Sequence, residues 1–384
     1  MRKRGSCGYQ AVTVPSCHVT VSTLHLGLFS RLSFSVGSPV TQKLQSFLMA
    51  TERKSEEPPT MSEISAGGDI TFVVGPEETR LRVCSTILKN ASKYFSALLG
   101  PNFREGQDIG KGIPKEILLP EENAQSLEII FNVLHLRNEA VPKSLSPISI
   151  LEIAIAADKF DCTVAMQHVS TIWLSPKKVT DAQELGRLMT AAYVFDNAEA
   201  FSDVTRWIIM HHQNSYLALM DSETENWIPW RTLRKCWLCQ NARVICWQQV
   251  IVLLEERRNK MRTELQQIII EGATRAGDRD DDQCKCGWSS CHSLAYLILI
   301  KKERVHPVQM LDLSVAQLVE TLEWMDDPRM PKQWSQCSYR WHSNPTYRLG
   351  RSYQLGKLKE SHGLCIDCLH VDEGAAKGVC RINH

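Results

Sequence analysis

Residues 69–84 read DITFVVGPEETRLRVC, and this stretch decides the fold. Its first half is a short run of β-branched and aromatic residues that ends at Gly75-Pro76. Its second half alternates Leu81 and Val83 with arginines, which is the period-two pattern of a half-buried strand. We therefore expect two strands that form a hairpin around a turn at residues 76–78.

The hydrophobic period changes after this hairpin. Apolar residues recur at helical spacing from Ile87 to Leu99, and Gly100-Pro101 ends the pattern, so we expect a helix there. Another strand is predicted from Lys115 to Pro120, followed by a helix from Asn123 to Arg137.

Three short segments carry a family resemblance. In order they are CSTILKNASKYF at residues 84–95, Phe103-Arg104-Glu105-Gly106, and Ala157-Asp158-Lys159-Phe160. Together they resemble the BTB (POZ) domain over residues 66–175. The resemblance implies the α+β class with a small sheet capped by helices, a protein-binding role, and a further pair of helices behind the domain.

Two positions depart from the family pattern. Cys84 stands where the signature has a histidine, and we expect it to be buried and inert. His135-Leu136-Arg137 stands where the usual tripeptide is Tyr-Thr-Gly. The sequence of residues 136–142 is similar to that found in BTB proteins from filamentous fungi.

The composition excludes several classes of protein. The 384 residues carry a net charge of +1, so no global field favours nucleic acid or a membrane surface. No apolar run is long enough to cross a bilayer. Fourteen cysteines without a secretory signal indicate a reducing compartment, and we expect an intracellular protein of the cytoplasm or nucleus.

The chain before the BTB-like region, residues 1–65, reads as a disordered basic leader and linker. Residues 1–51 contain no Asp or Glu, which also resembles a mitochondrial transit peptide. An over-extended gene start is a further alternative, because Met49 and Met61 lie close to the domain.

Behind the BTB-like region we expect a helical pair in residues 176–215, at 182–195 and 198–212. Residues 216–277 combine a Trp-rich segment with a long helix over 244–271. The apolar residues of that helix follow a 4-3 spacing that is interrupted once, by Arg258, so it packs either as a coiled coil or on the protein's own core. The lone Cys236-x-x-Cys239 motif indicates buried thiols rather than a redox or zinc site.

Cysteines and histidines concentrate in residues 278–384, where they form short clusters. Two helices, 294–302 and 311–323, are expected between the first two clusters. Chelating turns such as CxxC or Cys-x3-His supply two ligands each to a tetrahedral zinc ion. We therefore predict a zinc-stabilised module with one or two structural ions. The alternative is a set of scattered thiols and surface imidazoles. The candidate ligands are Cys284, Cys286, His292, Cys337, His342, Cys365, Cys368, Cys380 and His384.

Basic and aromatic residues are interleaved in the same region. They are Arg340, Trp341, Tyr347, Arg348, Arg351, Tyr353, Lys357, Lys359, Lys377 and Arg381. Those from Arg348 to Tyr353 could contact phosphates and stack on bases, and the alternative is a solvated surface.

No motif of a known catalytic class occurs in the sequence, so we expect a protein that is not an enzyme. The first reading is an interaction protein that binds protein partners through the BTB-like domain. One alternative is a substrate adaptor of a cullin-type ubiquitin ligase, although no Kelch-like repeat is present. The other is a nucleic-acid-binding transcriptional regulator. Self-association is possible. The polar, proline-bearing stretch 55–67 argues only against a dimer that forms by strand swapping.

Overall fold

The computed structural model describes residues 61–107, 109–110, 112–220, 247–274, 287–329, 347–370 and 379–384. All of them lie within one compact unit. The sequence-based predictions for residues 1–60, for the Cys236–Cys239 motif and for the acidic loop 278–282 fall outside these ranges. No helix in the described ranges is long and apolar enough to span a bilayer.

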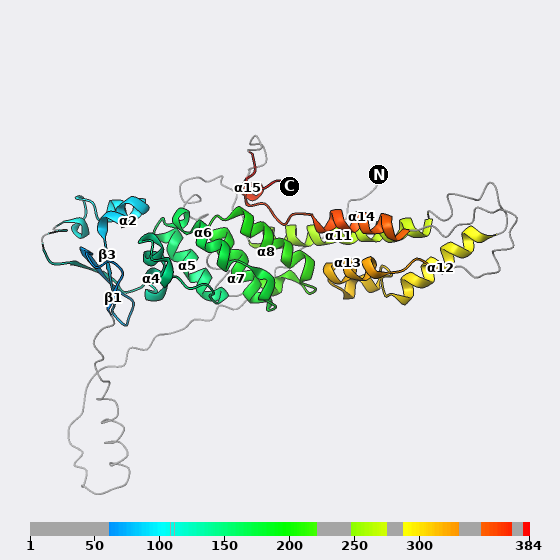
Figure 1. Ribbon diagram of the computed structural model, residues 1–384, viewed down its shortest axis with the longest axis horizontal. Coiled ribbons are helices and arrows are strands. Elements are labelled where there is room, and N and C mark those ends of the chain that lie inside the picture. Colours follow the sequence, from blue (N-terminus) through cyan, green and yellow to red (C-terminus); the bar gives the residue numbers. More distant parts are fainter. Residues whose placement is uncertain are drawn as a thin grey trace, which may run out of the picture. The chain divides into compact units, whose positions relative to one another are not determined.

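A four-stranded mixed sheet lies at one end of the described chain (Figure 1). Its strands follow the order β1-β3-β2-β4. β2 and β3 are antiparallel, as the predicted hairpin requires, and β4 runs parallel to β2. The bounds are β1 (Met61–Glu63), β2 (Ile70–Val74), β3 (Thr79–Val83) and β4 (Lys115–Leu119). Every residue of β2 is buried, which explains why its sequence, ITFVV, does not alternate between apolar and charged residues.

The hairpin turn confirms the expected break at Gly75-Pro76. Gly75 has a φ of 74° and Glu78 a φ of 51°, so the chain twice enters the left-handed region that glycine adopts at no steric cost. β1 was not expected from the sequence. Its three residues pair in parallel with Arg80, Leu81 and Arg82 of β3, so the polar stretch before the hairpin adds an edge strand to its own sheet.

The single helix predicted before Gly100 is divided into α2 (Ser85–Ala91) and α3 (Lys93–Leu98). Ser92 lies between them with an extended backbone. Its hydroxyl accepts the backbone N–H of Phe95 and donates to the carbonyl of Phe160. Because Ser92 caps α3 and also binds Phe160, the helix is interrupted here even though the apolar residues continue at helical spacing.

The helices behind the sheet bury a cluster of phenylalanines. Phe95 stacks on Phe160 at 5.3 Å between ring centroids, and Phe72 stacks on Phe131 at the same separation. All four rings are buried. Phe95 lies in α3, Phe72 in β2, Phe131 in α4 (Ala124–Leu134), and Phe160 at the end of α5 (Pro147–Lys159). The next helix is α6 (Thr163–Trp173). This cluster joins the sheet to its helical cover.

The predicted helix pair is confirmed as α7 (Ala182–Val194) and α8 (Ala198–His211). Each begins at a capping side chain, Asp181 for α7 and Asn197 for α8. α7 packs closely on α5, so the pair continues the core of the sheet-bearing region.

The remaining helices differ from expectation mainly in their bounds. They are α11 (Trp247–Thr274), α12 (Trp288–Lys302), α13 (Val315–Trp324), α14 (Tyr347–Lys359) and α15 (Ile366–His370). α12 begins at Trp288 rather than at Leu294, directly after Gly287, whose φ of 77° turns the chain. α14 and α15 were not expected.

Arg258, which interrupts the apolar spacing of α11, is buried. Its guanidinium donates to the carbonyls of His212, Gln213 and Asn214 just beyond α8, lies over the ring of Tyr216 and pairs with Glu255. Carbonyl groups at the end of a helix have no N–H donor within that helix. Here the guanidinium of Arg258 serves as the donor. The interruption therefore marks where α11 attaches to α8. The long helix lies on the protein's own core, which is one of the two packings predicted for it.

Candidate metal centre and interaction surface

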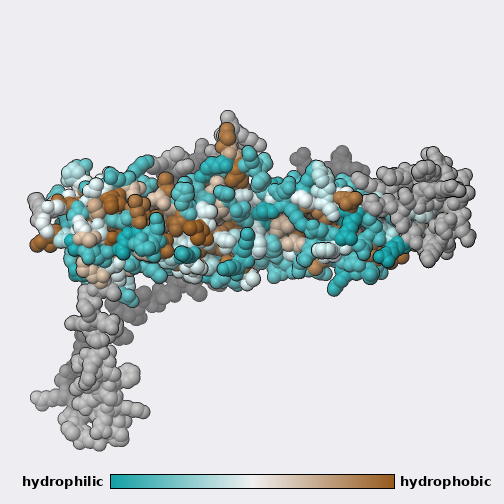
Figure 2. All heavy atoms as spheres, viewed as in Figure 1, coloured by the Kyte–Doolittle hydropathy of each residue, from teal (hydrophilic) through white to brown (hydrophobic). Residues whose placement is uncertain are grey.

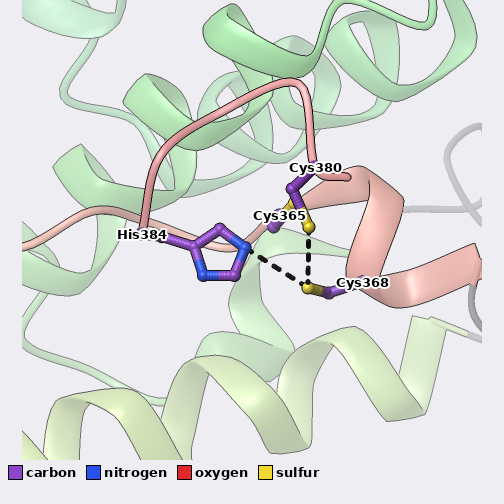
Figure 3. Close-up of side chains that lie close together, drawn as sticks. All are labelled: Cys365, Cys368, Cys380 and His384. Carbon is purple, nitrogen blue, oxygen red and sulfur yellow. Dashed lines mark hydrogen bonds between the residues drawn. The ribbon is translucent and has the colours of Figure 1, made fainter. Parts of the chain in front are cut away.

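Four predicted ligands come together near the end of the chain: Cys365, Cys368, Cys380 and His384 (Figure 3). Their ligand atoms all lie within 4.8 Å of one another. The Sγ of Cys368 is 3.6 Å from the Sγ of Cys380 and 3.3 Å from the Nε2 of His384. Cys365 is buried, whereas Cys368 and His384 are exposed.

These separations fit a tetrahedral ion. Zn–S bonds of about 2.3 Å and Zn–N bonds of about 2.0–2.1 Å at tetrahedral angles place sulfurs roughly 3.8 Å apart and a sulfur and a nitrogen roughly 3.6 Å apart. Three thiols and one imidazole form a donor set used by structural zinc. The four residues can therefore hold a metal ion with little rearrangement.

The first two ligands flank the start of α15, and a close contact with α8 places them. Gly363 lies against this helix so tightly that a Cβ atom there would be 2.0 Å from the carbonyl oxygen of Ser202. The next residue, Leu364, donates its backbone N–H to the hydroxyl of Thr205 at 2.9 Å. Only glycine permits this approach, so Gly363 fixes the position of the Cys365–Cys368 turn on α8.

The other two ligands lie on the segment 379–384, which Arg381 fastens. Its guanidinium donates to the carbonyl and the carboxylate of Asp196 in the α7–α8 turn and to the carboxylate of Asp367 in α15. Asp367 also accepts the backbone N–H of Arg381 at 2.7 Å. The hydrogen bonds and charges of the two carboxylates raise the pKa of Arg381, which keeps the clamp charged. Cys380 and His384 are thereby held opposite α15.

Crowding of the sulfurs affects their ionisation. Burial, together with the neighbouring Cys380 and Cys365, raises the pKa of the Cys368 thiol to about 12. A bound cation reverses this preference, because a coordinating thiol is deprotonated outright. Metal binding here is thus coupled to the release of protons.

The other candidate ligands do not join this cluster. Cys284, Cys286, Cys337 and His342 lie outside the described residues. His292 is buried in α12, where it stacks on Trp288 at 5.0 Å between centroids. Neither ring nitrogen of His292 has a hydrogen-bond partner among the described residues, and burial lowers its pKa. A second site that contains His292 stays a prediction.

Sequence reasoning overlooked the role of Arg381 in supporting the cluster. It counted Arg381 only among the basic residues of this region, yet Arg381 binds Asp196, which no local pattern connects with it. Among the other basic residues, Arg351 is buried against the carbonyl of Leu322, and Lys359 pairs with Glu323. These cations bind acceptors of the protein itself, which weakens the nucleic-acid reading.

A second candidate site lies on the sheet-bearing region. Phe103, Ile113 and Leu118 are exposed apolar residues that flank η1 (Arg104–Gly106) and extend onto β4. Lys115 of β4 donates to the carbonyls of Arg104 and Gln107, which holds the two segments together. On the face seen in Figure 2, hydrophobic patches interrupt the polar surface of this region. We call Phe103, Ile113 and Leu118 the β4 patch.

Comparison with protein families identifies this region. The family model of the BTB/POZ domain matches residues 62–175. These residues are a BTB/POZ domain. The match begins at 62 rather than at 66, in agreement with β1, and it confirms the BTB resemblance. It leaves the fungal resemblance untested. A comparison with curated proteins found no match.

The BTB/POZ domain and α8 enclose a cleft of about 470 Å³. Residues from the end of α6 to Lys177 form one wall, and Glu199, Asp203, Arg206, Trp207 and His211 of α8 belong to the other. Trp207 and His211 stack on each other at 3.8 Å between ring centroids. The helix pair thus adds a concave surface to the domain.

Proposed function

We propose that this protein is a non-enzymatic interaction protein that binds protein partners through its BTB/POZ domain. The observation that carries the proposal is the match of this domain to residues 62–175 on the expected sheet and helices. The β4 patch supplies apolar side chains that the domain's own core does not bury. Leu118 lies on β4, and Phe103 and Ile113 lie in the chain that leads to it; exposed apolar side chains of this kind are typical of contact surfaces.

The test compares the full chain with variants of the β4 patch. Leu118→Glu changes a side chain that is 70% exposed, so the fold should be retained. Affinity capture with quantitative mass spectrometry should yield proteins that Leu118→Glu loses and the control Glu77→Lys, on the hairpin turn, keeps. If both variants retain the same bound proteins, the β4 patch is not the contact surface.

The second candidate function is a substrate adaptor of a cullin-type ubiquitin ligase. The cleft between the BTB/POZ domain and α8 favours it, because it offers a concave contact formed jointly by the domain and its following helices. A purified cullin N-terminal domain should bind the chain, and Ser175→Arg, which fills the cleft, should abolish binding. Gln183→Arg, at an exposed position in the first turn of α7, is the matched control. No binding by the unmodified chain would exclude this candidate.

We further propose that the metal of the Cys365–His384 cluster is a structural zinc ion. The donor set and the separations support zinc, and no open coordination position would remain for a substrate. The ion would neutralise the thiolates and hold segment 379–384 to α15. Elemental analysis of protein purified without chelator should give at least one zinc per chain. Replacement of Cys365 and Cys368 together by serine should remove one equivalent, and an unchanged zinc content would place the ion elsewhere.

A further inference from the structure

We propose that Cys368 and Cys380 form a disulfide under oxidising conditions, and that this bond replaces the metal in holding segment 379–384 to α15. The inference rests on the proposed zinc site and concerns how that site is regulated. Its basis is a short separation between two sulfurs, a difference in exposure among the ligands, and an anchor that does not depend on the ion.

The separation is already close to bonding distance. The two sulfurs lie 3.6 Å apart across the opposed segments, and a disulfide bond is about 2.05 Å long. Rotation of the exposed Cys368 side chain toward the half-buried Cys380 covers the difference. Figure 3 shows both sulfurs pointing into the space between the four side chains.

Exposure decides which thiol reacts first. Cys365 is buried beside Leu364 and Ile366, whereas Cys368 is exposed at the surface of the cluster. A peroxide therefore meets Cys368 before Cys365. Cys380 is then the half-exposed thiol beside it that can resolve the oxidised sulfur.

The chemistry balances with hydrogen peroxide as the oxidant. The Cys368 thiolate attacks one peroxide oxygen, the O–O bond breaks, and a proton is taken up to give a sulfenic acid and water. The Cys380 thiolate then attacks the sulfenic sulfur, the S–O bond breaks, and a second proton gives another water. Two thiolates lose two electrons in total, and the metal leaves as a divalent ion because only Cys365 and His384 remain to bind it.

The segment stays in place because a covalent bond takes over from the ion. Arg381 binds Asp196 and Asp367 in every state and keeps the two sulfurs opposite each other, but these partly exposed ion pairs are too weak to hold the segment alone. The disulfide joins the same two backbone segments that the ion joins. Oxidation therefore releases metal without freeing segment 379–384, whereas chelation of the reduced protein releases both.

The test uses the full chain in three states: as purified, treated with hydrogen peroxide, and reduced in the presence of a chelator. A colorimetric indicator reports released zinc, peptide mass spectrometry maps disulfides, and the rate of tryptic cleavage after Arg381 reports how firmly the segment is held. The first two states should be cleaved at the same slow rate. The reduced, chelated state should be cleaved about tenfold faster, because cleavage follows the population of the opened segment.

Two variants sharpen the result. Cys380→Ser should lose the peroxide-induced disulfide and should be cleaved rapidly after oxidation. Cys291→Ser, which changes an exposed cysteine of α12 outside the cluster, should behave as the unmodified chain. A disulfide between Cys365 and Cys368, or none at all, overturns the proposal, as does rapid cleavage of the oxidised protein. The disulfide map decides this proposal with or without bound zinc, whereas the zinc content of the purified protein decides the one on which it rests.

Discussion

Phe95 is fully buried at the centre of the phenylalanine cluster. It contacts Phe72, Phe131 and Phe160 with ring centroids less than 6 Å apart. We expect Phe95→Ala to lower the free energy of unfolding by about 3–5 kcal/mol, because the loss of a buried ring leaves a cavity. Chemical denaturation followed by circular dichroism measures the change. Tyr94→Ala is the control: this neighbouring ring is 39% exposed and should cost much less. Equal effects of the two changes would contradict this account of the core.

His135 makes the stability of the domain depend on pH. Its Nδ1 lies 2.8 Å from the carbonyl oxygen of Phe131. Because a carbonyl only accepts hydrogen bonds, Nδ1 carries the proton and donates, and the unprotonated Nε2 accepts the backbone N–H of Cys84 at 3.0 Å. This arrangement requires a neutral ring. Burial is the main cause that lowers the pKa of His135 below 6.5, and the charge of Arg137 adds to it.

The sign of the effect follows from linkage. His135 takes up a proton at a higher pH in the unfolded chain than in the folded one. The stability that the neutral imidazole contributes is therefore complete above pH 6.5, and it is lost as the pH falls through the pKa of His135 in the folded protein. Thermal melting between pH 7.5 and 5 should show a steeper decline for the unmodified chain than for His135→Gln. Parallel curves for the two proteins would show that the imidazole is not the titrating group.

Residue patterns predicted side-chain types better than side-chain partners. The Cys84 position was recognised as unusual, yet this residue is half-buried rather than buried. The histidine that binds its backbone lies fifty-one positions away, at the other departure from the family pattern. Similarly, cysteine and histidine spacing selected all four members of the metal cluster but could not tell which candidate ligands share a site, and His292 lies apart from these four. A ligand set depends on distances across the fold, which spacing does not contain.

At the scale of elements, strong hydrophobic periods were reliable and their interruptions were informative. The hairpin, α4, α7 and α8 agree with the predicted ranges to within a few residues. The division between α2 and α3 was missed because it depends on a bond from Ser92 to Phe160. α14 was missed because its sequence is polar and contains glycines, and packing against α11 and α13 compensates for its low helix propensity.

Arg258 makes a prediction at this scale. We expect Arg258→Met to lower stability by about 2–3 kcal/mol, because it leaves the carbonyls beyond α8 without their charged donor. Lys260→Met on the exposed face of α11 is the matched control and should change stability little. Denaturation midpoints of the two variants measure the difference. If Arg258→Met is as stable as the control, α11 attaches to α8 through its apolar residues alone.

For the whole molecule, the contacts hardest to foresee join segments far apart in sequence. Residues 363–384 return to α8 and to the α7–α8 turn through Gly363, Leu364 and Arg381. None of these positions carries a pattern that names its partner. The predicted division of the chain at residues 175, 215 and 277 stays a prediction.

Metal removal tests the reach of this attachment. A chelator in reducing buffer should speed hydrogen exchange in segments 361–370 and 379–384 and in the part of α8 that they contact. Structural zinc contributes on the order of 10 kcal/mol of apparent binding energy in small zinc modules, enough to decide whether such a segment is ordered. The amides of β2 and α4 should keep their protection, because the phenylalanine cluster does not involve the ion. Uniform loss of protection, or none, would contradict the local role assigned to the metal.

Asp196 lies where these two regions meet. It ends the turn after α7, which packs on α5 of the BTB/POZ domain, and its carboxylate binds the arginine between two metal ligands. A partner that moved α7 and with it the contact between Asp196 and Arg381 would alter the affinity of the cluster for its ion. The ion would then alter the affinity for that partner by the same factor, since coupling between two binding equilibria is reciprocal. The availability of zinc in the cell would then set how tightly the domain holds its partner.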